Sequence, residues 1–426
     1  MKQLRVAAAL TVAAAVMLAA PALARADAVT DWSVIAANAI FAPPAPTAHA
    51  STLSFAMVHG AVYDAVNAIE GGYQPYLTKP DATPFDSVDA AVARASYRVL
   101  AYLLPAQQSS LEATYKAKIA GISEPARSNG IAVGEATAAA MIAARTGDGR
   151  LPAGTPYPFP FGTNAGEWRP SPPLLVAEPA WWVGNVRTFL VPDAEMLRSD
   201  GPNDLASAAY AEDFNEVKSL GALDSTTRTA DQTTAAIFWQ AQPLALYGGL
   251  MRSLSARFNL SPAENARMFA MVTLAAADGA IGCWNDKYYW KFWRPIDAIR
   301  LADTDGNPAT EADPNWKPLF DPSTPTTPAL ATPNFPDHPS GHSCVSSAVV
   351  HALQNFFGTD KIEFDIFSSR FPGQPRHYER FSQVLKEIID ARVWGGIHFR
   401  TADTQGAVIG KKVAHWERKH YFQPLG

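Results

Sequence analysis

The sequence predicts a mostly α-helical, soluble, globular fold, and three observations support this. Several Ala-rich segments repeat apolar residues three and four positions apart, which places them on one face of a helix. No series of alternating apolar and polar residues is long enough for a large β-sheet. With 426 residues, of which 48% are hydrophobic and 18% charged, the chain can bury the core of one large or two ordinary domains.

The segments expected to be helical are 52–70, 89–104, 129–146, 226–240, 261–293 and 404–420. The 261–293 helix has the clearest start, because Ser261 suits an N-cap and Pro262 suits the first helical position. Residues 150–202 are rich in Pro, Trp and Phe, and residues 303–338 are rich in Pro, Asp and Thr. Long irregular segments often form lids or binding loops, although they can also be loops without a functional role.

The first 26 residues, "MKQLRVAAALTVAAAVMLAAPALARA", have the three-part layout of a secretory signal peptide. Two basic residues precede an uncharged stretch over 6–20, and Ala-x-Ala pairs close the segment. A membrane anchor is the alternative, but the apolar run is shorter than the ~20 residues that a spanning helix needs. We therefore expect export to the periplasm or the extracellular space, no stable membrane anchor, and a single mature domain over 27–426.

Composition argues against other classes of protein. The net charge is −5 without a basic stripe, so nucleic-acid binding is not expected. Two cysteines, Cys283 and Cys344, cannot form a disulfide scaffold; an oxidising compartment would permit one bond, but two small buried side chains are the simpler interpretation. The segment "DTDGNPATEAD" (303–313) lacks the terminal Glu of a calcium loop and is interpreted as a surface turn.

One cationic cluster lies at the end of the 261–293 helix. Lys287 and Arg294 are seven residues apart, about two turns, which would place both on one helix face. The alternative is that Lys287 and Arg294 are solvated side chains on a helix surface. Aromatic residues around this face, among them Trp284, argue against that alternative. Pro295 directly after Arg294 favours a helix end there.

A second cluster follows an apolar helical stripe, formed by Phe381, Val384, Leu385, Ile388 and Ile389. Arg392 is the next member of that stripe, and a buried arginine needs an opposite charge. His398 lies six residues further on, beyond two glycines. A lone histidine here would more often be structural, but this one accompanies an arginine that faces the core.

The third cluster is "PSGH", residues 339–342, at the start of a helix whose apolar stripe begins at Val345. A helix N-terminus has unpaired N–H groups and the positive end of the helix dipole, which suits an anion. Ser340 adds a hydroxyl, Gly341 permits close approach to the backbone, and His342 can exchange a proton. An ordinary serine cap beside an incidental histidine is the alternative.

Together the three clusters suit a tetrahedral oxyanion such as phosphate or vanadate. They supply a lysine, two arginines, a hydroxyl, a free N–H and two histidines. Charge-assisted hydrogen bonds contribute roughly 1.5–3 kcal/mol each, so five or six of them could offset the dehydration of a multiply charged anion.

The order Lys287-x6-Arg294-Pro295, then 339–342, then Arg392-x5-His398 resembles the signature of the vanadium-dependent haloperoxidase and type 2 phosphatidic acid phosphatase superfamily. The likeness extends from about residue 30 to the C-terminus, with the motifs of the anion site in 284–400. Stretches such as "WRPIDAIRLADTDGNPAT" and "ARVWGGIHFR" look like the bacterial haloperoxidase branch. The resemblance implies a helical-bundle haloperoxidase-like fold with long Pro-rich loops.

The resemblance also implies a role for each motif residue. The residues that would bind the oxygens of the anion are Lys287, Arg294, Ser340, Gly341 and Arg392. His398 resembles the axial ligand of vanadium, and in the phosphatases the matching histidine is the nucleophile. His342 resembles the acid–base residue, while Trp284 and Phe335 would wall the pocket.

Three positions depart from the family pattern. Ala391 replaces the serine that usually precedes the arginine of the motif. Asp403 lies one residue beyond the position at which the phosphatases often have an aspartate, which leaves the partner of His398 undefined. Phe335 occupies a place where bromoperoxidase-type enzymes tend to have a histidine, which weighs against that subtype.

Three functional hypotheses follow. In the first, which the flanking stretches favour, the protein is a vanadate-dependent haloperoxidase that converts halide and hydrogen peroxide into hypohalous acid, which halogenates small organic substrates. Lys287 would assist by polarising the peroxide. In the second, it is an exported acid phosphatase that binds phosphate and acts through a phosphohistidine at His398. The third, a non-enzymatic anion-binding protein, leaves both histidines without a task. A homo-oligomer is compatible with all three.

Overall fold

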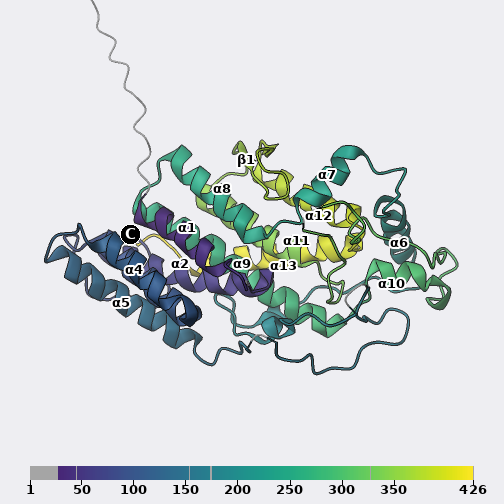
Figure 1. Ribbon diagram of the computed structural model, residues 1–426, viewed down its shortest axis with the longest axis horizontal. Helices are drawn as coiled ribbons and strands as arrows, with labels where there is room; N and C mark the ends of the chain where they lie inside the picture. Colours follow the sequence, from purple (N-terminus) through teal and green to yellow (C-terminus); the bar gives the residue numbers. More distant parts are fainter. Residues whose placement is uncertain (1–26, 45, 153, 173–174, 327, 426) are drawn as a thin grey trace, which may run out of the picture.

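A computed structural model describes residues 27–44, 46–152, 154–172, 175–326 and 328–425 (Figure 1). The predicted signal peptide, 1–26, lies outside the described residues. The described part contains thirteen α-helices, four short 3-10 helices and one two-stranded antiparallel sheet. The prediction of a mostly α-helical fold is therefore confirmed, whereas the single-domain division stays a prediction.

The α-helices are α1 (Ala28–Ile40), α2 (Ala48–Glu70), α3 (Val88–Leu103), α4 (Gln108–Ile119), α5 (Ala126–Arg145), α6 (Ala208–Leu220), α7 (Ala230–Phe238), α8 (Pro243–Phe258), α9 (Pro262–Trp290), α10 (Pro295–Arg300), α11 (Gly341–Phe357), α12 (Phe381–Trp394) and α13 (Arg400–His420). Strand β1 (Phe364–Ile366) pairs with β2 (Arg376–Tyr378). The described parts of the two Pro-rich segments carry only short 3-10 turns: Trp181–Asn185, Ala194–Leu197 and the last two residues of Ala302–Thr304.

Helix α9 is the central element of the fold. It packs against α2 on one side and α11 on another, and α11 packs in turn against α13. Figure 1 shows α1–α5 at one end of the molecule and α6, α7, α10 and α12 at the other. Among the described helices, only α9 is long and apolar enough to cross a membrane, but nearly all of its apolar stretch is buried within the fold.

The start of α9 is as predicted. Ser261 Oγ accepts a hydrogen bond from the Glu264 N–H, and Glu264 Oε2 accepts one from the Ser261 N–H, which together form a capping box. Pro262 is the first helical residue. An N–H at this position would have no intrahelical acceptor, so the absence of one in proline costs no hydrogen bond.

The predicted end of α9 is wrong. The helix stops at Trp290 because Lys291 adopts the left-handed conformation, with φ of 49°, and closes the last turn. Arg294 is instead the N-cap of α10, which begins at Pro295. Lys287 and Arg294 therefore do not share a helix face, and another feature must bring them together.

Other helices also differ from the prediction. The helix expected over 226–240 is the shorter α7, which starts after a capping box between Thr229 and Gln232. Helices α1, α4, α6, α8 and α10 were not predicted. Two adjacent glycines within α8 lower the intrinsic helix propensity of that segment, so packing on its neighbours determines its structure.

Two glycines of α13 allow it to lie directly against the start of α11. A Cβ atom at Gly410 would lie 2.3 Å from the Cys344 carbonyl oxygen, and one at Gly406 would lie 2.8 Å from the Ser340 carbonyl oxygen. The Ser340 N–H donates a 2.8 Å hydrogen bond to the Ala402 carbonyl. This close contact holds the N-terminus of α11 in place.

We expect Gly410→Ala to lower the free energy of unfolding by about 1–3 kcal/mol, because the new methyl group overlaps the backbone of α11. Gly249→Ala is the matched control: Gly249 is also helical, and a Cβ atom there has no neighbour within 4 Å. This control should stabilise the protein by about 0.5–1 kcal/mol. Urea-induced unfolding measures both, and equal effects of the two substitutions would contradict the proposed contact.

Candidate functional site

The predicted site residues converge on one pocket of about 520 Å³. Those that line it are Trp284, Phe335, Gly341, His342, Arg392 and His398. Lys287, Arg294 and Ser340 do not line the pocket, but all three are fully buried. Each contacts a residue that lines the pocket, or the chain neighbour of such a residue. The three clusters thus meet in space although they lie on different helices and turns.

Arg294 is fixed mainly by backbone carbonyl groups. Its Nε donates to the Phe335 carbonyl at 2.8 Å, and its Nη1 donates to the Ile397 carbonyl at 2.6 Å. The nearest carboxylate oxygen, Asp337 Oδ1, lies 3.8 Å from Nη1. The buried Nη2 has no hydrogen-bond partner in the described part of the chain. One edge of this buried guanidinium is therefore left without an acceptor from the described residues.

Because Arg392 is buried, we expected it to form an ion pair with a carboxylate of the protein, and the structure shows a different arrangement. Within the described residues no acidic side chain lies at ion-pair distance from it. Instead, Nη1 donates to the neutral amide oxygen of Gln240 at 3.2 Å, while the buried Nε has no partner. Burial lowers the pKa of Arg392 to about 9. A bound anion would supply the missing opposite charge.

Ser340 and Gly341 begin α11 in an unusual way. Ser340 is the N-cap, but its side chain makes no capping hydrogen bond, and the buried Oγ, although close to Asp403, has no hydrogen-bond partner among the described residues. The first N–H groups of a helix also lack intrahelical acceptors. Gly341 faces the indole of Trp284, where a Cβ atom would lie only 2.8 Å from a ring carbon. The alternative of an ordinary serine cap is therefore wrong.

Lys287 holds the loop that precedes α11. Its Nζ donates to the carbonyl oxygens of Pro336 at 2.8 Å and Asp337 at 2.9 Å, and also to that of Pro339. Burial lowers the pKa of Lys287 to about 8, and the charge of Arg294 acts in the same direction. The ammonium group therefore positions residues 336–339 and adds positive charge beneath the pocket.

His398 is oriented by a residue that the sequence analysis missed. Its Nδ1 lies 2.8 Å from Asp337 Oδ1, and its Nε2 lies 3.2 Å from Arg294 Nη1. Gly396, with φ of 74°, makes the turn between α12 and His398. Burial raises the pKa of Asp337, although the charges of Arg294 and Lys287 oppose that rise. Asp337 is thus the partner of His398 that the family comparison left undefined.

Asp403 was considered as a hydrogen-bond partner of His398, but it binds Ser343 instead. It accepts a 2.8 Å hydrogen bond from Ser343 Oγ, within the contact between α13 and α11. Burial raises the pKa of Asp403 to about 7. No hydrogen bond joins it to His398 among the described residues.

His342 faces the pocket with a free ring nitrogen. Its Nε2 is buried and has no hydrogen-bond partner within the described residues. Burial lowers its pKa well below the usual value, and the positive charge of Arg392 lowers it further. The same causes, burial followed by nearby positive charges, lower the pKa of His398. Both rings are therefore neutral at neutral pH and can accept a proton when an anion balances the local charge.

A histidine–glutamate pair in the pocket lining was also missed. His49 Nε2 lies 2.9 Å from Glu178 Oε2, and the indole N–H of Trp284 donates to Glu178 Oε1 at 2.6 Å. The His49 ring stacks on Trp284 at a centroid distance of 3.9 Å. Glu178 comes from the Pro-rich segment at 150–202, so part of that segment lies at this site. No local motif marks either residue in the sequence.

The unpartnered groups fit a tetrahedral oxyanion such as vanadate. Within the described residues, buried atoms without a hydrogen-bond partner include Arg294 Nη2, Ser340 Oγ, His342 Nε2 and Arg392 Nε. Leaving such groups unpaired is costly, and a multiply charged anion would satisfy all of them. The described residues contain no group of three or more His, Cys, Asp or Glu side chains that could hold a bare metal ion. An oxyanion held by hydrogen bonds needs no such group.

Comparison with known proteins agrees with this geometry. Residues 267–425 match the family model of the second helical-bundle domain of VCPO. The vanadium chloroperoxidase of Curvularia inaequalis is 27% identical over 231 residues, which cover 42% of this chain and 37% of that protein. This part of the chain resembles the vanadium haloperoxidase superfamily. The matched region contains every site residue that the motifs of this superfamily predicted.

Solved structures of haloperoxidases share the fold over nearly the whole chain. The first bacterial vanadium-dependent iodoperoxidase is 22% identical, with a TM-score of 0.76 over 93% of this chain and 97% of that one. The apo form of a bacterial vanadium-dependent chloroperoxidase is 16% identical, with a TM-score of 0.69 over 94% of this chain and 95% of that one. At these identities the likeness establishes the haloperoxidase fold.

Ser340→Ala should weaken the binding of tungstate, a tetrahedral dianion, by about 10- to 100-fold, because it removes one hydrogen bond to a charged group. The free energy of unfolding should hardly change, since the hydroxyl caps no helix. Isothermal titration calorimetry and urea unfolding measure the two effects.

Ser261→Ala is the matched control, because Ser261 does cap its helix. This variant should lose about 1 kcal/mol of stability and keep its tungstate affinity. A Ser340 variant that loses stability but binds tungstate normally would contradict the assignment.

Lys287 should make anion binding depend on pH. Because its pKa is about 8, the ammonium loses its charge as the pH rises above that value. A bound anion favours the charged form, so tungstate affinity should fall by about tenfold between about pH 7 and about pH 9. Calorimetry at several pH values tests this, since the charge of tungstate is constant over the range.

Lys287→Gln is the control for this pH dependence. It should bind tungstate more weakly than the wild type at about pH 7, with an affinity that changes little up to about pH 9. An equal decline in the variant would show that another group titrates.

Proposed function

We propose that the protein is an exported haloperoxidase that uses vanadate to oxidise halide with hydrogen peroxide. One halide, one peroxide and one proton would yield one hypohalous acid and one water. The observation that carries this proposal is the set of buried atoms on Arg294, Ser340, His342 and Arg392 that lack a partner among the described residues and lie near His398. The haloperoxidase relatives named above support the reaction class.

The residues that would hold vanadate divide into two groups. Arg294, Arg392, Ser340 and the N–H of Gly341 would bind its oxygens through hydrogen bonds. His398 would be its ligand from the protein. When bound, the vanadium(V) centre would supply Lewis acidity that activates hydrogen peroxide towards the halide.

The tautomer of His398 follows from its partners. If Nδ1–H donates to Asp337, the lone pair of Nε2 lies on the side of Arg294, where the anion would bind. Asp337 would therefore fix the ring orientation and increase the basicity of the ligating nitrogen. This arrangement requires no protonated histidine.

His342 is the residue proposed to move protons. Its free Nε2 faces the pocket, and its lowered pKa keeps the ring neutral, so it can accept a proton once the anion has neutralised the arginines. It would accept a proton from the entering peroxide and return a proton to the departing oxygen. A site that only bound an anion next to His398 would not need the free imidazole of His342.

Lys287 would act at longer range than the sequence analysis suggested. Its three hydrogen bonds to carbonyl groups fix the loop that carries Asp337 and leads into Ser340. Its charge would also favour negative charge that develops on the peroxide. In this proposal its positioning role comes first.

Orthovanadate distinguishes this proposal from the phosphatase alternative because it has opposite effects on the two. We expect the purified protein to oxidise bromide or iodide with hydrogen peroxide only after addition of orthovanadate. A phosphatase would instead hydrolyse p-nitrophenyl phosphate, and orthovanadate would inhibit it.

His342→Ala should lower the kcat of halide oxidation by about 100-fold or more, because it removes general acid–base catalysis, while tungstate still binds. The exposed His420 provides a control variant, His420→Ala, which should keep full activity. Phosphate-ester hydrolysis that is inhibited by orthovanadate, without halide oxidation, would contradict the proposal.

A further inference from the structure

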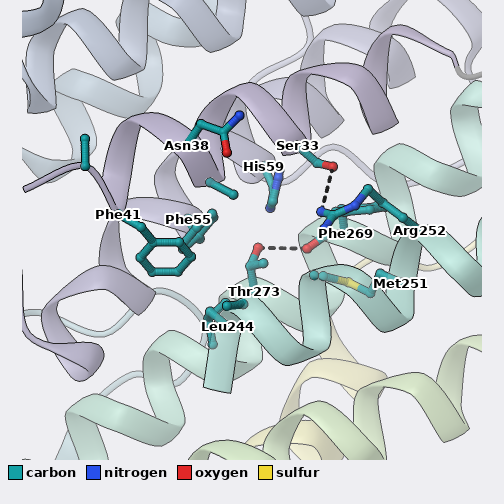
Figure 2. Close-up of a pocket in the computed structure, with 14 residues that line it drawn as sticks. Ser33, Asn38, Phe41, Phe55, His59, Leu244, Met251, Arg252, Phe269 and Thr273 are labelled. Carbon is teal, nitrogen blue, oxygen red and sulfur yellow. Dashed lines mark hydrogen bonds between the residues drawn. The ribbon is translucent and has the colours of Figure 1, made fainter. Parts of the chain in front are cut away.

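A second pocket, of about 380 Å³, lies between α1, α2, α8 and α9 (Figure 2). Its volume is at the lower end of the range of small-molecule sites. It shares no lining residue with the anion site and contains none of the motif residues. Nothing in the proposed haloperoxidase chemistry requires it.

His59 is the most unusual residue of this pocket. It is 3% exposed, and neither of its ring nitrogens has a hydrogen-bond partner in the described part of the chain. Burial, with a contribution from the charge of Arg252, lowers its pKa to about 3, so the ring is neutral and offers one donor and one acceptor. Two unsatisfied polar atoms on one buried ring are costly, and a ligand in the pocket would satisfy the one that it reaches.

Arg252 supplies positive charge without a carboxylate partner. Its Nη1 donates a long, 3.4 Å hydrogen bond to Ser33 Oγ, and no acidic residue lies at ion-pair distance among those described. Arg252 also lines a neighbouring pocket with Asp27 and Asp31, but Asp27 caps α1 and Asp31 pairs with Lys118 at 2.7 Å. Figure 2 shows Arg252, His59 and Thr273 facing the same space from three helices.

The remaining walls are apolar and largely aromatic. Rings from Phe41, Phe55 and Phe269 surround the space, and Leu244 and Met251 complete it. The Phe269 ring lies edge-on to His59, at a centroid distance of 5.1 Å. Aromatic rings and methionine sulfur both favour contact with an aromatic ligand. No acidic residue lines the described pocket.

We propose that this pocket binds a small aromatic carboxylate that carries a second hydrogen-bonding group, such as a phenolic acid. The carboxylate would pair with Arg252 and Ser33, the ring would lie among the phenylalanines, and the hydroxyl would bond to His59. Such a ligand would join four helices of the fold without touching the anion site.

Titration calorimetry with 4-hydroxybenzoate, on the intact mature protein without vanadate, tests this proposal. One molecule should bind per chain, and benzoate should bind more weakly by about 2- to 10-fold because it lacks the hydroxyl. Arg252→Gln should weaken binding of 4-hydroxybenzoate by about 10- to 100-fold.

A pocket-filling variant and its neighbour separate this site from others. A Cβ atom at Gly248 would lie 3.3 Å from Arg252 Nη1, so Gly248→Leu extends into the pocket and should abolish binding. At Gly249 a Cβ atom has no neighbour within 4 Å, so Gly249→Leu should bind as the wild type does. Arg392→Gln should also bind normally, because that residue belongs to the anion site.

Three results would overturn the proposal. These are no binding by the wild type at millimolar concentration, undiminished binding by folded Gly248→Leu, and loss of binding in Arg392→Gln. The last would place the ligand in the anion pocket. Thermal unfolding of each variant shows whether it is folded. The test does not depend on haloperoxidase activity, so its outcome is separate from that of the proposed function.

Discussion

Three buried cations, of which only Arg294 has a carboxylate at ion-pair distance among the described residues, are the constraint on which the rest of the structure depends. Backbone carbonyl groups and one neutral amide hold Lys287, Arg294 and Arg392, so most of their charge is left uncompensated. The carboxylates nearby, Asp337 and Asp403, are themselves buried, and burial raises the pKa of each. A pocket with this balance favours a multiply charged anion over a neutral ligand.

The fold keeps this arrangement rigid through backbone contacts. Helix α13 approaches α11 through glycines, which fixes the helix start at Ser340, and Lys287 ties the preceding loop to α9. Gly341 permits the same start to lie against the indole of Trp284. Because backbone carbonyl groups and the Gln240 amide hold the cations, the donors are organised before the anion binds, and little conformational entropy is lost on binding.

The sequence predicts the parts of this site that depend on local patterns. Ser261 and the glutamate three residues later mark the start of α9, and the motifs identify the cations and both site histidines. Local patterns could not show that Lys291 takes a left-handed conformation, which ends α9 before Arg294 and takes that residue off the helix face of Lys287. Contacts between distant segments, such as that of Glu178 with His49, leave no periodic signal at all.

The most direct test of the central claim is a crystal structure of the purified protein with tungstate, located by its anomalous scattering. We predict one strong peak within hydrogen-bond distance of Ser340 Oγ, Arg294 Nη2 and Arg392 Nε, next to His398 Nε2. A peak elsewhere with none at this position, or arginines that turn away from the ion, would contradict the account.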